Sequence, residues 1–211
     1  MKKLLVLAVL LISVLISLNA QGFYLDTGIG FGGASSFLDG TSVNNLFTGE
    51  RRSFGASLDL SSKAGYGPIA NIPLYLVGTL GAIFHLNLAS EAKDFSVDYV
   101  NIGAGLLLYP VPFIQLAGSI GAAMGGIRLF GSDLIDVPLP INDAGIQRDD
   151  GNGFFFDVSA AFDYGRRNHG FLAGIKYTGM FVPSLDESGL RLNTHTRSLF
   201  VKYGRRHKIK N

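Results

Sequence analysis

Alternation of apolar and polar residues constrains the fold of this chain most strongly. In the stretch FFFDVSAAFDYG at 154–165, apolar side chains occupy every second position, and Asp157 and Asp163 lie between them. Successive side chains of a strand point to opposite faces, so this stretch predicts a strand with one apolar and one charged face. Seven further segments repeat the period, and together they predict eight strands at 23–34, 54–65, 74–87, 98–109, 113–126, 154–165, 171–181 and 196–203.

The connections between these segments alternate in length. Short connections fall at 66–73, 110–112 and 165–170, and long ones at 35–53, 88–97, 127–152 and 182–195. Barrels of the bacterial outer membrane have short periplasmic turns and longer outer loops. Strands of about eleven residues, tilted by about 40°, cross an apolar band of about 25 Å. Unpaired backbone groups are costly in hydrocarbon, so such a sheet must close on itself. The predicted fold class is all-β, a closed antiparallel eight-stranded up-and-down transmembrane β-barrel.

The first twenty residues have a different character. Lys2 and Lys3 precede an uncharged apolar run at 4–18, and Ala20 provides a small residue for cleavage. We expect a cleavable signal peptide at 1–20, because the run is shorter than the roughly 20 residues of a membrane-spanning helix. An uncleaved signal anchor is the alternative. The barrel is expected at 21–203 and a basic periplasmic tail at 204–211.

Composition narrows the function classes. The chain has 28 Gly, only 16 % charged residues and no Cys, which favours a membrane protein and excludes disulfides and thiolate metal sites. A net charge of +2 gives no support for nucleic-acid binding. Two uncharged windows at 64–90 and 99–127 suggest transmembrane helices, but repeated Gly and the pair Pro110 and Pro112 argue against helices. A soluble lipocalin-like barrel would reverse the two faces.

Over the mature chain, the alternation and the loop lengths resemble the small eight-stranded outer-membrane barrels of the OmpA, OmpX and OmpW type. The resemblance implies residence in the lipid bilayer of the cell outer membrane after export through the periplasm. Because the number of strands is even, we expect both termini on the periplasmic side. The resemblance also implies a monomer that the barrel-assembly machinery inserts. Such barrels usually end on an aromatic residue, whereas here GRRHKIKN at 204–211 follows Tyr203.

The face opposite the lipid carries charges that an eight-stranded lumen must bury. Buried charges require partners, so we expect a lumen ion-pair network. Reflection of strands about their turns places Lys63 close to Asp26, and Lys176 between Asp157 and Asp163. The expected network comprises Asp26, Asp59, Lys63, Asp157, Asp163 and Lys176. A proton or ion relay through these groups is the alternative.

Aromatic residues gather at the expected strand ends, as in the girdles of membrane barrels. We expect a periplasmic girdle of Phe23, Tyr164, Phe171 and Tyr203, and an outer girdle of Phe54, Phe84, Phe154 and Phe181.

No catalytic, metal or cofactor site is expected. Lipid-modifying barrels of this size need a His beside a Ser on the outer wall, with an acid that orients the His. His85 is expected to face the lumen, and His195 is expected in a loop. The residues at 149–153 lack the spacing of a calcium loop.

We therefore expect a structural or surface-interaction role through loops 35–53 and 127–152, which an extracellular ligand or host component would contact. The alternatives are a narrow channel or small-ligand carrier with a Gly-lined lumen and, less favoured, a lipid-modifying enzyme.

Overall fold

The computed structural model describes residues 22–43, 55–69, 72–86, 94–130, 147–165 and 169–206. These residues form one closed antiparallel barrel of eight long strands, with one additional short strand. The expected Phe54, the signal peptide, most of the tail and the centres of the first and third long loops lie outside the described residues. The strands are β1 (Phe23–Leu38), β2 (Thr41–Ser42), β3 (Gly55–Tyr66), β4 (Leu74–Leu86), β5 (Asp94–Val111), β6 (Ile114–Phe130), β7 (Gln147–Asp163), β8 (His169–Val182) and β9 (Leu192–Arg206).

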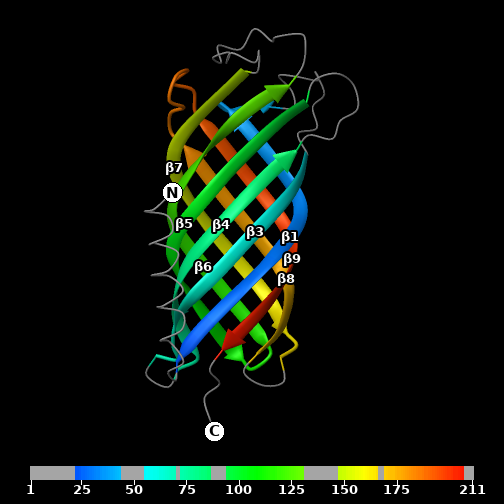
Figure 1. Ribbon diagram of the computed structural model, residues 1–211, viewed down its shortest axis with the longest axis vertical. Coiled ribbons are helices and arrows are strands. Elements are labelled where there is room, and N and C mark those ends of the chain that lie inside the picture. Colours follow the sequence, from blue (N-terminus) through cyan, green and yellow to red (C-terminus); the bar gives the residue numbers. More distant parts are fainter. Residues whose placement is uncertain are drawn as a thin grey trace, which may run out of the picture.

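The topology is up-and-down. Each long strand pairs with the next long strand along the chain, and β1 also pairs with β9 from Tyr24↔Arg206 to Leu38↔Leu192. This last pairing closes the sheet, so the barrel has no free edge. The strands are steeply tilted, and β1 begins and β9 ends at the lower end of the barrel (Figure 1). The predicted fold class is confirmed.

Most strands extend beyond their predicted limits at the upper end. β5 begins at Asp94, β7 at Gln147 and β9 at Leu192, each several residues before the predicted start. Backbone pairing needs no apolar face, so the ladder continues where the alternation of apolar residues fades. As one consequence, His195 lies within β9 and not in a loop as expected.

The outer wall is apolar over most of its height. Ile120, Leu199 and Phe31 are 71 %, 70 % and 62 % exposed, and the alternating residues of the same strands are buried inside. A soluble barrel would bury these side chains, so the faces have the arrangement of a barrel in lipid. In the part of the chain that the structure describes, no helix is long and apolar enough to cross a membrane.

Two larger apolar clusters fill the ends of the lumen, and a third, smaller one consists of Ala161, Leu172 and Phe200. The lower cluster consists of Tyr24, Tyr75, Val77, Leu107 and Tyr109, with Ala117 packed against it. The upper cluster consists of Leu38, Val43, Ile83, Phe95, Val97, Tyr99, Ala123, Ile127, Phe155, Met180, Val182, Leu185 and Leu192.

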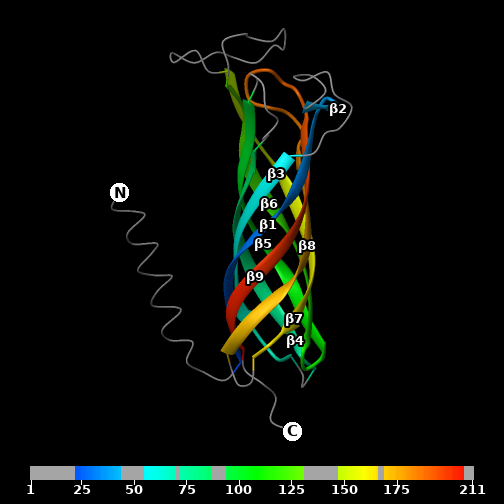
Figure 2. The same cartoon turned by 90° about the vertical axis from the view of Figure 1, so that its right-hand side faces the viewer.

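The connection at 183–191 contributes to the upper cluster and lies at the upper end of the barrel (Figure 2). Leu185 is buried there and forms an isolated bridge with Gly151 of β7. The carboxylate of Asp149 accepts hydrogen bonds from the backbone N–H groups of Glu187 and Ser188, at 3.1 and 2.8 Å. This loop therefore packs onto the mouth of the barrel and is held there by β7.

Candidate functional site

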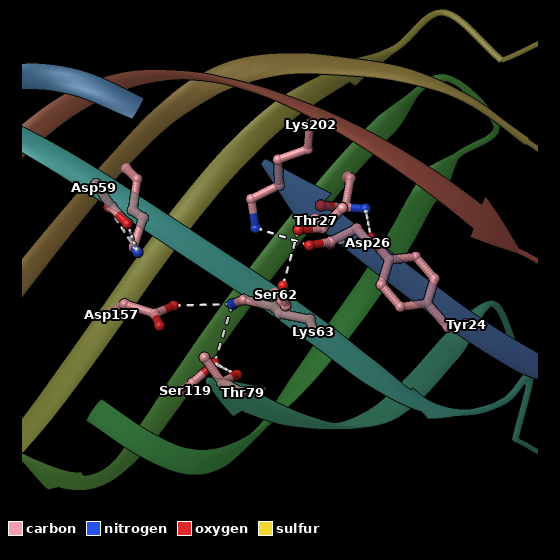
Figure 3. A network of polar contacts seen from close by, with 12 residues as sticks. Tyr24, Asp26, Thr27, Asp59, Ser62, Lys63, Thr79, Ser119, Asp157 and Lys202 are labelled. Carbon is pink, nitrogen blue, oxygen red and sulfur yellow. Dashed lines mark hydrogen bonds and ion pairs between the residues drawn. The ribbon is translucent and has the colours of Figure 1, made fainter. Parts of the chain in front are cut away.

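Three lysine–aspartate ion pairs occupy the lumen between the two apolar clusters. Lys63 Nζ lies 3.0 Å from Asp157 Oδ1, and Lys202 Nζ lies 3.0 Å from Asp26 Oδ1. Lys176 Nζ lies 2.7 Å from Asp59 Oδ2. All six side chains are buried, and three positive charges balance three negative ones. Figure 3 shows Lys63 reaching toward Asp157, and Lys202 toward Asp26.

The pairing differs from the sequence-based expectation. Asp26 and Lys63 are cross-strand neighbours on β1 and β3, but the Lys63 ammonium forms its ion pair with Asp157 on β7. Strand reflection identifies only neighbours within the sheet. The long lysine side chain instead crosses the narrow lumen, where the wall from another part of the barrel offers a carboxylate.

The expected partners of Lys176 are also wrong. Its register neighbour on β7 is Ser159, two residues from Asp157, yet its ion pair is with Asp59 of β3. Asp163 lies at the lower end of β7, where its Oδ1 accepts a hydrogen bond from the backbone N–H of Gly165 at 2.7 Å. Of the six residues expected in the network, five therefore form the central ion pairs.

Lys202 is the member that the sequence-based prediction omits. Its position on the inward face of β9 was the available signal, because it alternates with Leu199, Val201 and Tyr203 of the outer wall. Its neighbour on β1 is Gly28, where a Cβ would lie 2.4 Å from Lys202 Cγ. The glycine thus leaves the space through which the lysine enters the lumen.

Neutral polar groups complete the network. Lys63 Nζ donates a hydrogen bond to Ser119 Oγ at 3.0 Å, and Ser119 Oγ lies 2.9 Å from Thr79 Oγ1. Below them, the Tyr24 hydroxyl donates to Asp26 and accepts a hydrogen bond from Gln115 Nε2 at 2.7 Å. Charges that are paired and hydrogen-bonded can remain buried, so the arrangement supports a filled lumen.

The upper lumen contains a further group of hydrogen-bonded polar side chains around His85. His85 faces inward, as expected, and its Nδ1 lies 2.8 Å from Ser36 Oγ. Ser36 Oγ also lies 3.0 Å from Thr194 Oγ1. The ring of Phe95 packs edge-on against the imidazole at 5.3 Å between centroids. His85 is therefore a hydrogen-bonded part of the upper lumen.

Seven of the eight expected girdle residues are described. At the lower end, Phe171 and Tyr203 form a T-shaped pair at 5.3 Å, and Tyr164 is 64 % exposed. Toward the upper end, Phe154 stacks on Phe181 at 5.0 Å. Phe84 is on the outer face and Phe23 is half-buried. The role of these residues as girdles at the lipid interface stays a prediction.

His195 lies within β9 and not in a loop as predicted, and its side chain is on the outward face of the strand. Its Nδ1 lies 2.7 Å from the Tyr177 hydroxyl, and the rings of Phe37 and Phe181 pack edge-on against it. Ser35 of β1 is its register partner. Within the described ranges, no carboxylate is hydrogen-bonded to His195, and no group of three or more His, Asp or Glu side chains is placed to hold a metal ion.

Comparison with known proteins identifies the fold. No protein-family model and no curated protein matches the sequence. Among solved structures, the chain is similar to Ail, the attachment invasion locus protein of Yersinia pestis, in complex with the heparin analogue sucrose octasulfate. The TM-score is 0.55 at 14 % identity, over 88 % of this chain and 99 % of Ail. Neisserial surface protein A matches with a TM-score of 0.51 at 11 % identity, over 86 % of this chain and 96 % of that protein.

Proposed function

Since the chain has the fold of the small eight-stranded outer-membrane barrels, we propose that it is an outer-membrane protein with a closed lumen and a structural or surface-interaction role. One observation carries the proposal: three buried ion pairs fill the lumen between two apolar clusters. A barrel of eight strands encloses only enough space for side chains. The interior is therefore a rigid support, and interaction with other molecules falls to the outer surface and the loops.

The proposal includes an orientation. The described short connections lie at the end where β1 begins and β9 ends, and the ordered connection at 183–191 lies at the other end. In outer-membrane barrels short turns are periplasmic. We infer periplasmic termini, insertion by the barrel-assembly machinery as a monomer, and surface exposure of loops 35–53 and 127–152. The solved Ail complex, with its heparin analogue, illustrates that this fold can present a ligand-binding surface.

Planar-bilayer recording tests the closed lumen. We expect no conductance steps from the purified chain at neutral pH, with a large-pore porin as positive control. Steps that disappear in the Lys176→Met variant would instead identify the second candidate, a narrow channel. For orientation, an epitope inserted at residue 140 should bind antibody on intact cells, and one attached after Asn211 should bind only after permeabilisation.

The chain is also proposed to lack enzymatic activity, because His195 has a tyrosine and not a carboxylate as its Nδ1 partner. Mass analysis of lipid A from expressing cells should show the same acyl and phosphate pattern as cells that carry the His195→Ala variant. A modified lipid A that appears with the wild type alone would contradict this and place the reaction at Ser35 and His195.

A further inference from the structure

The outer wall contains a groove that the closed-lumen function does not use. It has a volume of about 740 Å³ and crosses β7, β8, β9 and β1. Its upper rim is formed by Val158, Tyr177 and Arg197, and its lower rim by Ala160, Ile175, Leu199 and Phe31. Each rim is a row of cross-strand partners on neighbouring strands. In the upper rim, Tyr177 pairs with Val158 on one side and with Arg197 on the other. In the lower rim, each residue pairs with the next in the order Ala160, Ile175, Leu199 and Phe31.

The groove is suited to a hydrocarbon chain. The outward-facing side chains that line it are aliphatic or aromatic apart from Arg197 and the Tyr177 hydroxyl, and between the two rims the lining also includes Gly32, Ser159, Lys176 and Ser198, of which Lys176 and Ser198 are buried. The small side chain of Ala160 widens the groove between Val158 and Phe162 of the same strand. Phe31 and Leu199 are strongly exposed and form one side of the groove. Because the groove lies in the apolar wall, a lipid acyl chain is the apolar partner that meets it at this height.

Arg197 is the unusual residue of this wall. It is exposed on the outward face of β9, and in the part of the chain that the structure describes it forms no ion pair with Asp or Glu. An arginine on the lipid face costs about 2–4 kcal/mol at the bilayer midplane and about 0–1 near the interface. An ionisable side chain in such a position is by default a candidate functional group.

The depth of Arg197 indicates the nature of its partner. Arg197 lies six positions before Tyr203 of the lower girdle, which is about 15 Å along the barrel axis at a rise of about 2.5 Å per tilted residue. Its register partner Tyr177 lies four positions before Phe181 of the upper girdle, which is about 10 Å along the same axis. The Cα of Arg197 thus lies in the outer half of the apolar band. Long basic side chains extend from such positions to the head groups.

We propose that the groove binds an acyl chain of a phosphorylated lipid of the outer leaflet, with the Arg197 guanidinium on the lipid phosphate. The planar guanidinium can make two parallel hydrogen bonds to phosphate oxygens. Tyr177 is the register partner of Arg197, and His195, two positions from Arg197 toward the upper end of β9, is hydrogen-bonded to the Tyr177 hydroxyl, so both residues place polar groups beside the guanidinium. The groove holds the acyl chain of the lipid, and the Arg197 guanidinium binds its negatively charged phosphate. These two contacts together distinguish this site from the nonspecific lipid contacts of the rest of the wall.

The experiment uses the full-length mature barrel in detergent and two probes, diphosphoryl lipid A and the same lipid A after removal of its phosphates. Native mass spectrometry measures the fraction of barrel that retains each probe. We expect the wild type to retain the phosphorylated probe about tenfold more strongly than the dephosphorylated one, as the loss of one charge-assisted contact would give. In Arg197→Gln this preference should disappear, and Arg197→Lys should keep part of it because the charge remains.

A second pair of variants tests the groove itself. Ala160→Phe fills the groove and should reduce retention of both probes, whereas Ala104→Phe places the same ring on the outward face of β5, on the other side of the barrel, and should leave retention unchanged. Equal retention of the two probes by the wild type, or an unchanged preference in Arg197→Gln, overturns the phosphate contact. Equal behaviour of the two phenylalanine variants overturns the groove. Ala160→Phe counts as evidence only if it shows the heat-modifiable gel migration of a folded barrel. If it does not, the proposal stands or falls with the preference of Arg197→Gln for the phosphorylated probe, because this substitution changes an exposed side chain.

Discussion

Removal of Lys176 provides the sharpest test of the filled lumen. Both oxygens of Asp59 face the Lys176 ammonium, at 3.0 and 2.7 Å, and both side chains are buried. At an effective dielectric constant of about 20, opposite charges 2.7 Å apart attract by about 332/(20 × 2.7), or about 6 kcal/mol. Desolvation of the two ions offsets much of this attraction, so the pair itself contributes little net stability. The situation changes when one partner is removed, because the remaining charge stays buried.

We therefore expect Lys176→Met to lower the free energy of unfolding by about 3–5 kcal/mol, and Asp59→Leu by a similar amount. The double variant should regain most of the loss, since it buries no unpaired charge. Ile175→Met, which changes the adjacent outward side chain, is the matched control and should cost less than about 1.5 kcal/mol.

The chain has no Trp, so unfolding by guanidinium chloride in detergent is best followed by far-ultraviolet circular dichroism, with heat-modifiable migration as a check of folding. A water-filled lumen would hydrate the orphaned Asp59. In that case Lys176→Met would lie within about 1 kcal/mol of the wild type, or the two single losses would simply add in the double variant. Either result refutes the reasoning that the lumen excludes water.

Two further predictions concern packing in the lumen and the connection at 183–191. Gly121→Ala should lower the free energy of unfolding by about 1–3 kcal/mol, because its Cβ would lie 2.8 Å from Phe155 Cε1 and closer still to backbone atoms. The control is Gly118→Ala, which should cost much less, because no atom lies nearer than 3.6 Å to its Cβ. Equal costs for the two would contradict the packing of Phe155 against Gly121. Asp149→Asn should accelerate proteolytic cleavage within 183–191 in reconstituted vesicles while leaving the barrel strands protected, because it weakens two hydrogen bonds to that loop. Unchanged cleavage would show that apolar packing of Leu185 alone holds the loop.

Local pattern accounts for the success of the sequence-based predictions. The alternation at 154–165 indicates only which face of a strand each side chain occupies, and the structure confirms this for the inward Asp157 and the outward Phe154. The number of long strands follows from the count of alternating segments. Closure of the sheet follows because a sheet in hydrocarbon cannot leave an edge unpaired. The signal peptide, the tail and the interface role of the girdles remain predictions.

Tertiary structure alone decided the relations across the barrel. Alternation in the sequence predicts that Lys63 and Lys176 face the lumen. Their partners, Asp157 and Asp59, depend on the stagger of the closed sheet and on how far a lysine side chain reaches across the lumen. The same holds for Lys202, for the place of His195 within β9, and for the loop held by Asp149. Alternation is a property of consecutive residues, whereas a contact between opposite walls exists only after closure has brought distant strands face to face.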